Sequence, residues 1–464
     1  MPLVAGIDSS TQSVKIVVRD ADTGALIREA RAPHPDGTEI DPRLWWEALT
    51  TALDGALDGV AAMSVAAQQH GMVVLDEHDA VIRPALLWND TRSAVDAELL
   101  IHELGGEAAW ADAVGSVPVA SFTVSKIRWL AREEPENAAR VARLMLPHDY
   151  LTWRLGGAGH EAATDRGDAS GTGYWSPQTG EYRQDLVALA LGHVPLLPRV
   201  CEPGVAIGET ASGVLLGPGT GDNMGAALGL NLQPGDVVVS LGTSGTAFAC
   251  SEFATADAAG FVAGFADATG RFLPLVCTLN AARVLSSTAQ LLGVDLEQLG
   301  ALALSAPVGS EGLTLIPYLD GERTPNLPNA RGSLHGISRD NLRPANVARA
   351  TIEGMLMGLA QAVDALSNCG VHAARILLIG GAAANPAVRA VAATIFTAPV
   401  HVPAAGEYVA NGAARQAAWV LSGAAEPPVW QVAQSEALAP AEGRHSHAVR
   451  SQYERAQEAL YDLP

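Results

Sequence analysis

The chain has 464 residues, 48% of them hydrophobic, with 50 Asp plus Glu against 29 Lys plus Arg and a net charge of −21. This composition predicts a globular chain of two or three domains, and its negative charge disfavours nonspecific binding to nucleic acid or anionic membranes. The only lysines are Lys15 and Lys126, and neither lies in a G-x-x-x-x-G-K-[ST] motif, so a Walker-type phosphate loop is excluded.

The first predicted element is a β-hairpin over residues 3–18 with a small polar tip, Asp8-Ser9-Ser10-Thr11-Gln12-Ser13. A similar hairpin is predicted over residues 237–250, with the tip Gly242-Thr243-Ser244-Gly245-Thr246. Tips of Gly, Ser and Thr leave backbone N–H groups and hydroxyls free to contact phosphate oxygens. For either hairpin alone an ordinary tight turn is the simpler interpretation, but the repetition is a first clue to how the chain is organised.

Strands and helices alternate along the rest of the chain. Before the second hairpin we predict a strand-like run over 61–74, helices over 91–104 and 124–155 with a break at Pro147, and a helix from 222 to 230. The turn over 233–236 is a natural domain boundary. Strands near 260–277 and helices over 281–292 and 344–368 follow. A buried strand over 376–379 then runs into Gly380-Gly381 and another helix, which leaves backbone N–H groups available to a nucleotide.

The cysteines and the apolar runs bear on the compartment. Cys201, Cys250, Cys277 and Cys369 are far apart, with no C-x-x-C motif and no zinc-ligand spacing, which is typical of core thiols in a reducing compartment. The first residues show no signal-peptide pattern, and no uncharged apolar run approaches the roughly 18 residues of a membrane span. We therefore expect a soluble cytoplasmic protein.

Two longer motifs resemble the signatures of the FGGY carbohydrate kinases. Ser121-Phe-Thr-Val-Ser-Lys-Ile-Arg-Trp-Leu-Ala-Arg-Glu resembles the first, and Gly332-Ser-Leu-His-Gly-Ile with Asn346-Val-Ala-Arg-Ala-Thr-Ile-Glu resembles the second. The likeness, which extends over residues 3–421, implies an α/β fold, the actin-like ATPase (ribonuclease H-like) fold of two duplicated domains around a catalytic cleft. We expect an N-terminal sugar-binding and catalytic domain over 1–234 and a C-terminal nucleotide-binding domain over 235–464.

The sugar-binding segments are most similar to those of the xylulokinases within this family. Gln68-Gln69-His70-Gly71 resembles their Gln-Met-His-Gly, and Leu87-Trp88-Asn89-Asp90-Thr91-Arg92 resembles the segment that follows. The sequence departs from the family pattern at Gln69, where Met is usual, at Ser9-Ser10, and at Asn411. The resemblance implies a sugar pocket lined by Gln69, His70, Trp88, Asn89, Asp90, Arg92 and Asn223.

Two carboxylates are the candidate catalytic residues. Gly219-Thr-Gly-Asp-Asn resembles the family segment with the catalytic Asp, and a sugar hydroxyl needs a base, so Asp222 is the expected general base. The alternative is that Asp222 only caps a helix. Asp8 follows a buried strand, where Mg²⁺, reached directly or through water, would compensate its charge. The alternative for Asp8 is a turn-forming role.

The resemblance also implies Mg²⁺ and ATP as phosphate donor. The nucleotide contacts are expected from Thr11, Ser13, Gly242, Thr243, Gly321, Gly381, Ala382 and Asn385. We expect phosphorylation of D-xylulose to D-xylulose 5-phosphate. The alternatives are another ketose or polyol (ribulose, gluconate or an alditol) and, from a different class, a non-sugar actin-fold ATPase. A homodimer is a further expectation, and residues 424–464, with a helix over 447–460, would be a packing helix or a dimer contact.

Overall fold

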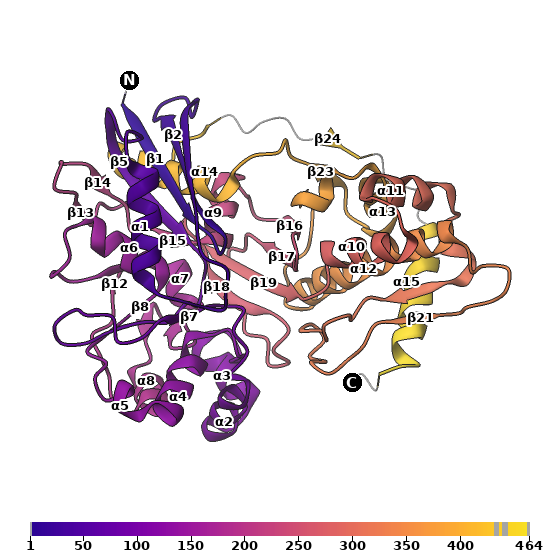
Figure 1. Cartoon of the computed structure of the whole chain (residues 1–464), viewed down its shortest axis with the longest axis horizontal. Coiled ribbons are helices and arrows are strands. Elements are labelled where there is room, and N and C mark those ends of the chain that lie inside the picture. The colour runs from indigo at the N-terminus through magenta and orange to yellow at the C-terminus, as the bar shows by residue number, and fades with distance from the viewer. Residues whose placement is uncertain (1, 431–435, 439–443, 462–464) are drawn as a thin grey trace. The chain divides into compact units, whose positions relative to one another are not determined.

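The computed structural model describes residues 2–430, 436–438 and 444–461, which form two compact units, each discontinuous in sequence (Figure 1). Unit 1 comprises Met1–Leu232, Cys250–Pro274 and Gly406–Val432. Unit 2 comprises Gln233–Ala249, Leu275–Ala405 and Ala433–Pro464. The segments 250–274 and 406–432, which we assigned to the C-terminal domain, belong to unit 1 because their β18 (Ala263–Ala266) and α14 (Tyr408–Ser422) pack on unit 1 elements.

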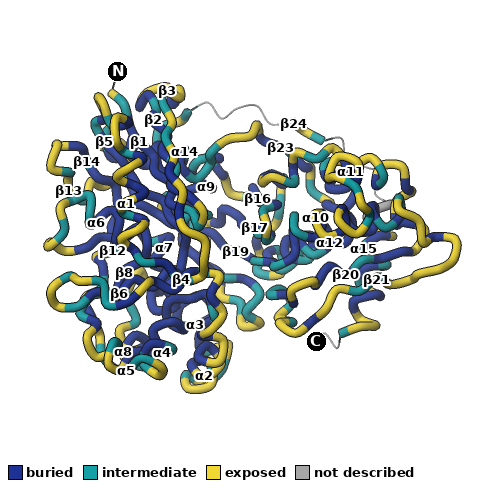
Figure 2. Tube along the Cα trace, in the orientation of Figure 1, coloured by how far each residue is buried: buried dark blue, intermediate teal, exposed yellow. Residues whose placement is uncertain are grey.

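The sheet of unit 1 is built on the first hairpin. β1 (Leu3–Ser9) pairs antiparallel with β2 (Ser13–Asp20), which pairs with β3 (Leu26–Pro33). On its other side β1 runs parallel to β5 (Val60–Ala67), and β15 (Thr220–Gly221) also runs parallel to β5. β1 and β5 are almost entirely buried (Figure 2), as expected for strands covered on both faces.

Helices cover both faces of this sheet. α1 (Pro42–Leu53) begins at the N-cap Asp41 and buries Trp45 and Leu49, four residues apart, in the same core as Ala5 and Ile7 of β1. Side chains alternate along a strand, so the neighbouring residues of β1 face the other way, onto α14. There a Cβ on Gly6 would overlap the backbone of α14, which shows how closely helix and strand approach.

Most remaining elements of unit 1 are short. They are β4 (Glu39–Ile40), β6 (Val73–Leu75), β7 (Ala85–Leu86), α2 (Ala94–Leu104), α3 (Glu107–Val114), α4 (Thr123–Glu133), α5 (Pro135–Ala138), β8 (Arg143–Met145), α6 (Pro147–Leu155), β9 (Ala163–Asp165), α7 (Arg166–Ser170), β10 (Trp175–Ser176), β11 (Glu181–Tyr182), α8 (Gln184–Leu191), β12 (Arg199–Cys201), β13 (Gly208–Glu209), β14 (Leu215–Leu216) and α9 (Asp222–Gly229).

Unit 2 repeats the plan of unit 1. β16 (Asp236–Leu241) pairs antiparallel with β17 (Gly245–Ala249) and parallel with β22 (Arg375–Ile379), as β1 does with β2 and β5. The other elements are β19 (Phe272–Thr278), α10 (Ala282–Leu292), α11 (Leu296–Ser305), the 3₁₀ turn η1 (Ser310–Gly312), β20 (Thr314–Ile316), β21 (Ser333–His335), α12 (Pro344–Asn368), the 3₁₀ turn η2 (Gly381–Ala384), α13 (Pro386–Ile395), β23 (Val400–Val402), β24 (Glu436–Ala437) and α15 (Arg444–Glu458).

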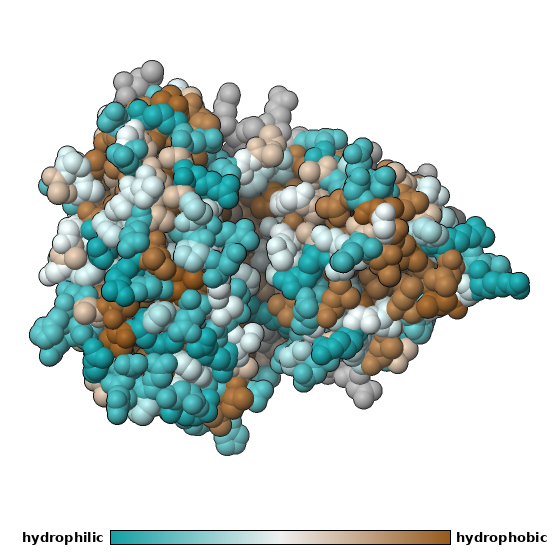
Figure 3. Space-filling view, in the orientation of Figure 1, coloured by the Kyte–Doolittle hydropathy of each residue, from teal (hydrophilic) through white to brown (hydrophobic). Residues whose placement is uncertain are grey.

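Both hairpins and the long helix α12 agree with the sequence predictions. The predicted helix over 124–155 is wrong in its middle, where β8 pairs antiparallel with β6. Leu144 and Met145 are buried in this pairing, so tertiary contact decides the local structure there. The face of the molecule drawn in Figure 3 mixes polar and apolar residues. Within the described residues, no helix is both long enough and apolar enough to cross a membrane.

Candidate active site

Three strand ends of unit 1 bring the candidate catalytic groups together. β1, β5 and β15 run parallel, and Ala66 of β5 lies opposite both Asp8 and Thr220. Their carboxyl ends therefore share one edge of the sheet, with Asp8 at the end of β1, Gln69 just after β5 and Asp222 just after β15. In open α/β sheets this edge is where ligands bind.

Asp222 is the first residue of α9. The N-cap is Gly221, so the helix-cap alternative does not describe Asp222. Its Oδ1 accepts hydrogen bonds from the backbone N–H of Asn223, at 2.8 Å, and from Asn223 Nδ2, at 3.0 Å. Burial, together with the nearby negative charge of Asp8, raises the pKa of Asp222 to about 7. A carboxyl group with this pKa changes protonation state near neutral pH, as a general base does.

The second carboxylate, Asp8, lies inside β1 and is 3% exposed. Because it belongs to the strand, the turn-forming alternative does not describe it. Burial raises the pKa of Asp8 to about 6, and its Oδ1 accepts a 2.5 Å hydrogen bond from Ser10 Oγ. Ser10, one of the departures from the family pattern, therefore touches this carboxylate directly. Nearby Lys15 pairs with Glu407 at 2.6 Å.

We expect kcat/KM for the sugar, measured at subsaturating ATP, to fall about tenfold for each pH unit below about 7. For Asp222 as the expected general base, the sign follows from its raised pKa, because the carboxyl is protonated below that pKa and a protonated carboxyl cannot accept the hydroxyl proton. The check is a pH–rate profile from pH 5 to 9, with activity regained at pH 8 after each exposure. An acid limb centred at pH 4 to 5 would contradict the prediction.

His70 is held in place from several sides. Its backbone has a positive φ of 67°, and its ring stacks on Phe122 with centroids 4.9 Å apart. The ring Nδ1 donates to the Gly171 carbonyl at 2.7 Å, and the His70 carbonyl accepts from Lys126 Nζ at 3.0 Å and from Thr123 Oγ1 at 3.2 Å. Lys126 and Thr123 belong to the first signature motif. The motif was therefore a signal in the sequence that these residues support His70, but the sequence did not show which residue they contact.

Gln69 is connected to the segment that carries Asp222. Its Oε1 accepts from Asn223 Nδ2 at 3.1 Å, while its buried Nε2 makes no hydrogen bond within the described residues. A Cβ on Gly221 would overlap the Gln69 side chain. Gln69 therefore packs directly on the turn before Asp222. Its amide oxygen accepts the hydrogen bond from Asn223, a contact that the Met of the family pattern could not make in the same way.

The segment with Trp88 contacts the first hairpin. Trp88 Nε1 donates to Thr11 Oγ1 at 3.0 Å, which brings a predicted sugar residue next to a predicted nucleotide residue. Ser13 is buried at the start of β2 and its carbonyl accepts from Ser10 N at 3.1 Å. Asn89 is exposed.

Asp90 and Arg92 are engaged mainly with protein. Asp90 Oδ2 accepts from Thr38 Oγ1 at 2.8 Å, and its Oδ1 accepts from Arg92 N and Nε at 3.0 and 2.9 Å. Arg92 also pairs with Glu39 at 2.7 Å and lies 5.1 Å over the Trp129 ring. Because these contacts use both oxygens of Asp90, the geometry favours a bracing role for the pair over direct sugar contact.

In unit 2 the predicted nucleotide residues gather at the end of two parallel strands. Ser240 of β16 lies opposite Ile379 of β22, so the tip with Gly242 and Thr243 and the turn with Gly381 and Ala382 follow at the same edge. The Gly242 carbonyl accepts from Ala282 N at 2.9 Å.

The two other predicted nucleotide residues differ in surroundings. The Gly321 carbonyl accepts from Asn280 Nδ2 at 2.7 Å. Asn280 lies in the stretch that joins β19 to α10. Asn385, in contrast, is the N-cap of α13. Its Oδ1 accepts from Ala387 N and its Nδ2 donates to the Leu296 carbonyl, both at 2.9 Å, so its side chain is engaged with protein.

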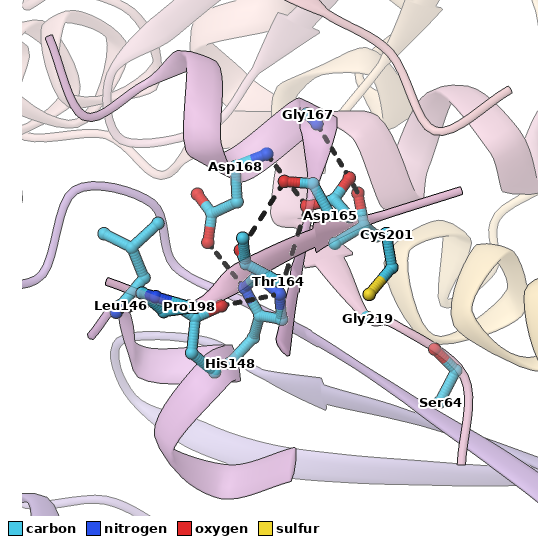
Figure 4. Close-up of polar contacts among 12 residues, drawn as sticks. Ser64, Leu146, His148, Thr164, Asp165, Gly167, Asp168, Pro198, Cys201 and Gly219 are labelled. Carbon is cyan, nitrogen blue, oxygen red and sulfur yellow. Dashed lines mark hydrogen bonds and ion pairs between the residues drawn. The ribbon is translucent and has the colours of Figure 1, made fainter. Parts of the chain in front are cut away.

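A buried charged cluster near Asp222 was not predicted from the sequence. His148 lies beside Asp165 and Asp168 (Figure 4) and also contacts Asp149, all in unit 1. The segments Pro147-His148-Asp149 and Asp165-Arg166-Gly167-Asp168 were visible in the sequence, but nothing local indicated that they meet.

Two profiles of one known protein family match most of the chain. A sequence profile of the FGGY family of carbohydrate kinases, N-terminal domain, matches residues 3–229, and the profile of its C-terminal domain matches residues 237–421. A xylulose kinase of Streptomyces coelicolor is 48% identical over 438 residues, covering 91% of this chain and 89% of the relative. One of Streptomyces rubiginosus is 46% identical over 460 residues, covering 94% and 92%.

The fold has solved counterparts. The crystal structure of xylulose kinase from Bifidobacterium adolescentis has a TM-score of 0.90 and 45% identity, covering 98% of this chain and 99% of that one. The structure of a glycerol kinase with ADP from Plasmodium falciparum has a TM-score of 0.86 at 16% identity, which bears on the fold alone.

Proposed function

The chain belongs to the FGGY family of carbohydrate kinases, and from this premise we propose that it transfers the γ-phosphoryl group of ATP to the terminal hydroxyl of D-xylulose. The relatives that are 48% and 46% identical, both xylulose kinases, support this substrate. The observation that carries the mechanism is the position of Asp222, a half-buried carboxyl with a pKa of about 7 at the edge where three parallel strands end.

Asp222 is the proposed general base. As the sugar oxygen attacks the γ-phosphorus, its O–H bond breaks and the proton passes to the Asp222 carboxylate. A new O–P bond forms while the bond from the γ-phosphorus to the bridging oxygen breaks, and ADP leaves with that electron pair. The hydrogen bonds from Asn223 hold Oδ1, which leaves Oδ2 to accept the proton.

Asp8 is the proposed site for Mg²⁺. Asp8 is a buried carboxylate near the end of β1, and among the described residues it makes no ion pair. Such a group suits a divalent cation, which would compensate its charge. Mg²⁺ usually keeps several waters and takes few protein carboxylates, so Asp8, reached directly or through water, would be sufficient. Bound Mg²⁺ would neutralise phosphate charge, while Thr11, Ser13 and the tip with Gly242 and Thr243 donate to phosphate oxygens.

Sugar recognition rests on polar groups in fixed positions. An uncharged polyol is selected by hydrogen bonds to each hydroxyl, and a site of this kind rejects analogues that lack one. We assign these contacts to Gln69, His70, Trp88, Asn89 and Asn223. Gln69 Nε2, buried and without a hydrogen bond within the described residues, is the best placed spare donor. Asp90 and Arg92 then hold the loop with Trp88 and Asn89.

A sugar panel tests the substrate. We expect kcat/KM with ATP to be highest for D-xylulose, and lower by about 10²-fold or more for ribulose, gluconate and alditols, because each leaves a buried polar group of the site unpaired. A coupled assay of ADP release measures it. A higher kcat/KM for another sugar would overturn the xylulose assignment while leaving the kinase, and ADP release that no sugar increases would favour a non-sugar ATPase.

We further propose that the enzyme acts in the cytoplasm. The four cysteines are far apart in the sequence, with no C-x-x-C motif, a pattern typical of proteins in a reducing compartment. A homodimer stays a prediction.

A further inference from the structure

The buried cluster behind β15 contains one imidazole and three carboxylates. His148 Nδ1 lies 2.6 Å from Asp168 Oδ2, while Nε2 lies 3.1 Å from Asp149 Oδ1 and 3.9 Å from Asp165 Oδ1. None of the four side chains is more than 1% exposed. Charges buried to this extent persist only when they are paired, so the cluster is a built feature of unit 1.

The cluster contacts the segment that leads into Asp222. Thr220 Oγ1 donates to Asp165 Oδ2 at 3.0 Å, two residues before Asp222. The His148 ring lies against Gly219, which has a positive φ of 83°, and a Cβ there would overlap the ring. Gly219 is fixed from its other side as well, because its N–H donates to Gln416 Oε1 and its carbonyl accepts from Gln416 Nε2.

Charge supports the same connection. Burial alone would lower the pKa of His148, but Asp149, Asp168 and Asp165 outweigh it and raise the pKa to about 9, so the imidazole is cationic at neutral pH. Within the described residues it is the one cationic partner that makes an ion pair with these three carboxylates. The cation thus offsets negative charge beside Asp222, whose pKa Asp168 also raises.

We propose that His148 and Asp165 are positioning residues for the phosphoryl transfer, which hold the backbone of residues 219–221 through Gly219 packing and the Thr220 hydroxyl and so aim Asp222 at the sugar hydroxyl. This inference rests on the proposed function of Asp222. It assigns a task to His148 and Asp165, two buried charged residues that touch neither sugar nor nucleotide in the proposed mechanism.

The sharpest test removes one hydrogen bond. Thr220→Val keeps the side-chain shape but loses the hydroxyl that donates to Asp165. We expect kcat to fall roughly 10- to 100-fold, as misplacement of a catalytic group does, with the sugar KM changed less than about twofold. Thr220→Ser, which restores the hydroxyl, should recover most of that loss. The matched control is Thr394→Val in α13 of unit 2, a buried Thr that donates to its own helix, and it should keep the wild-type kcat.

His148→Gln removes the cation and provides the second variant. If it folds, as judged by circular dichroism and by ATP binding, we expect a loss of kcat at least as large as that of Thr220→Val. Wild-type kcat in Thr220→Val, or in folded His148→Gln, overturns the inference. If His148→Gln does not fold, Thr220→Val decides. Asp222→Asn separates the two proposals, because turnover retained there refutes the base assignment, whereas loss there with wild-type Thr220→Val refutes only the positioning role.

Discussion

Asp222→Asn is expected to lower kcat by roughly 10²–10⁴-fold, the usual contribution of a general base. Asn keeps the size of Asp and can still accept from Asn223, so α9 and the contact between Asn223 and Gln69 should persist. KM for sugar and for ATP should therefore stay within a few fold, because the lost interaction with the proton is made only in the transition state. Steady-state kinetics and calorimetric titration of both substrates measure the two parts.

The matched control for this substitution is Asp185→Asn. Asp185 is an exposed residue at the start of α8 that pairs with Arg183, so its neutralisation should leave kcat at the wild-type value. An Asp222→Asn enzyme with kcat within threefold of wild type would refute the base assignment. A loss of sugar binding equal to the loss of kcat would instead make Asp222 a binding residue.

Gly412→Ala is expected to reduce the free energy of unfolding by about 3 kcal/mol, the upper part of the range for overpacked sites. Gly412 lies in α14 where that helix crosses α9, and a Cβ there would overlap the backbone of Gly225 and Gly229. Backbone atoms cannot move aside as a flexible side chain can, so the two helices must separate. Urea denaturation of Gly412→Ala and of the wild type measures the change in the free energy of unfolding.

The control is another glycine within a helix. A Cβ on Gly358 in α12 would meet only the Tyr453 hydroxyl, at 4.0 Å. Gly358→Ala should therefore be neutral or slightly stabilising, by up to about 1 kcal/mol, because Ala is the better helix former. Equal stability of Gly412→Ala and wild type would show that α14 and α9 are not in contact as described.

The sequence was sufficient for features that depend on local pattern or on family motifs. Both hairpins, the long α12 and the actin-like ATPase fold with its two duplicated α/β halves were predicted and are confirmed. The position of Asp222 at the start of a helix after a glycine turn was also readable, because Gly219-Thr-Gly-Asp is a contiguous signal.

Long-range contacts could not be read in the same way. The pairing of β8 with β6, the support of His70 by Lys126 and the meeting of His148 with Asp165 each join segments that lie apart in sequence. Asn411, one of the departures from the family pattern, accepts from Arg19 Nε at 2.9 Å through its Oδ1 and so connects α14 to β2. These residues meet only in the folded chain, and the sequence near each residue does not indicate which distant residue it will contact.

The return of α14 onto β1 sets a condition on synthesis of the chain. The strand face with Gly6 is completed by Ala410 and Ala414, which are translated about 400 residues later. At about 5–20 residues per second this interval lasts roughly 20–80 s, during which the first strand to leave the ribosome has no helix on one of its faces. Unit 1 therefore finishes folding after most of unit 2 has been synthesised, although it contains the N-terminus.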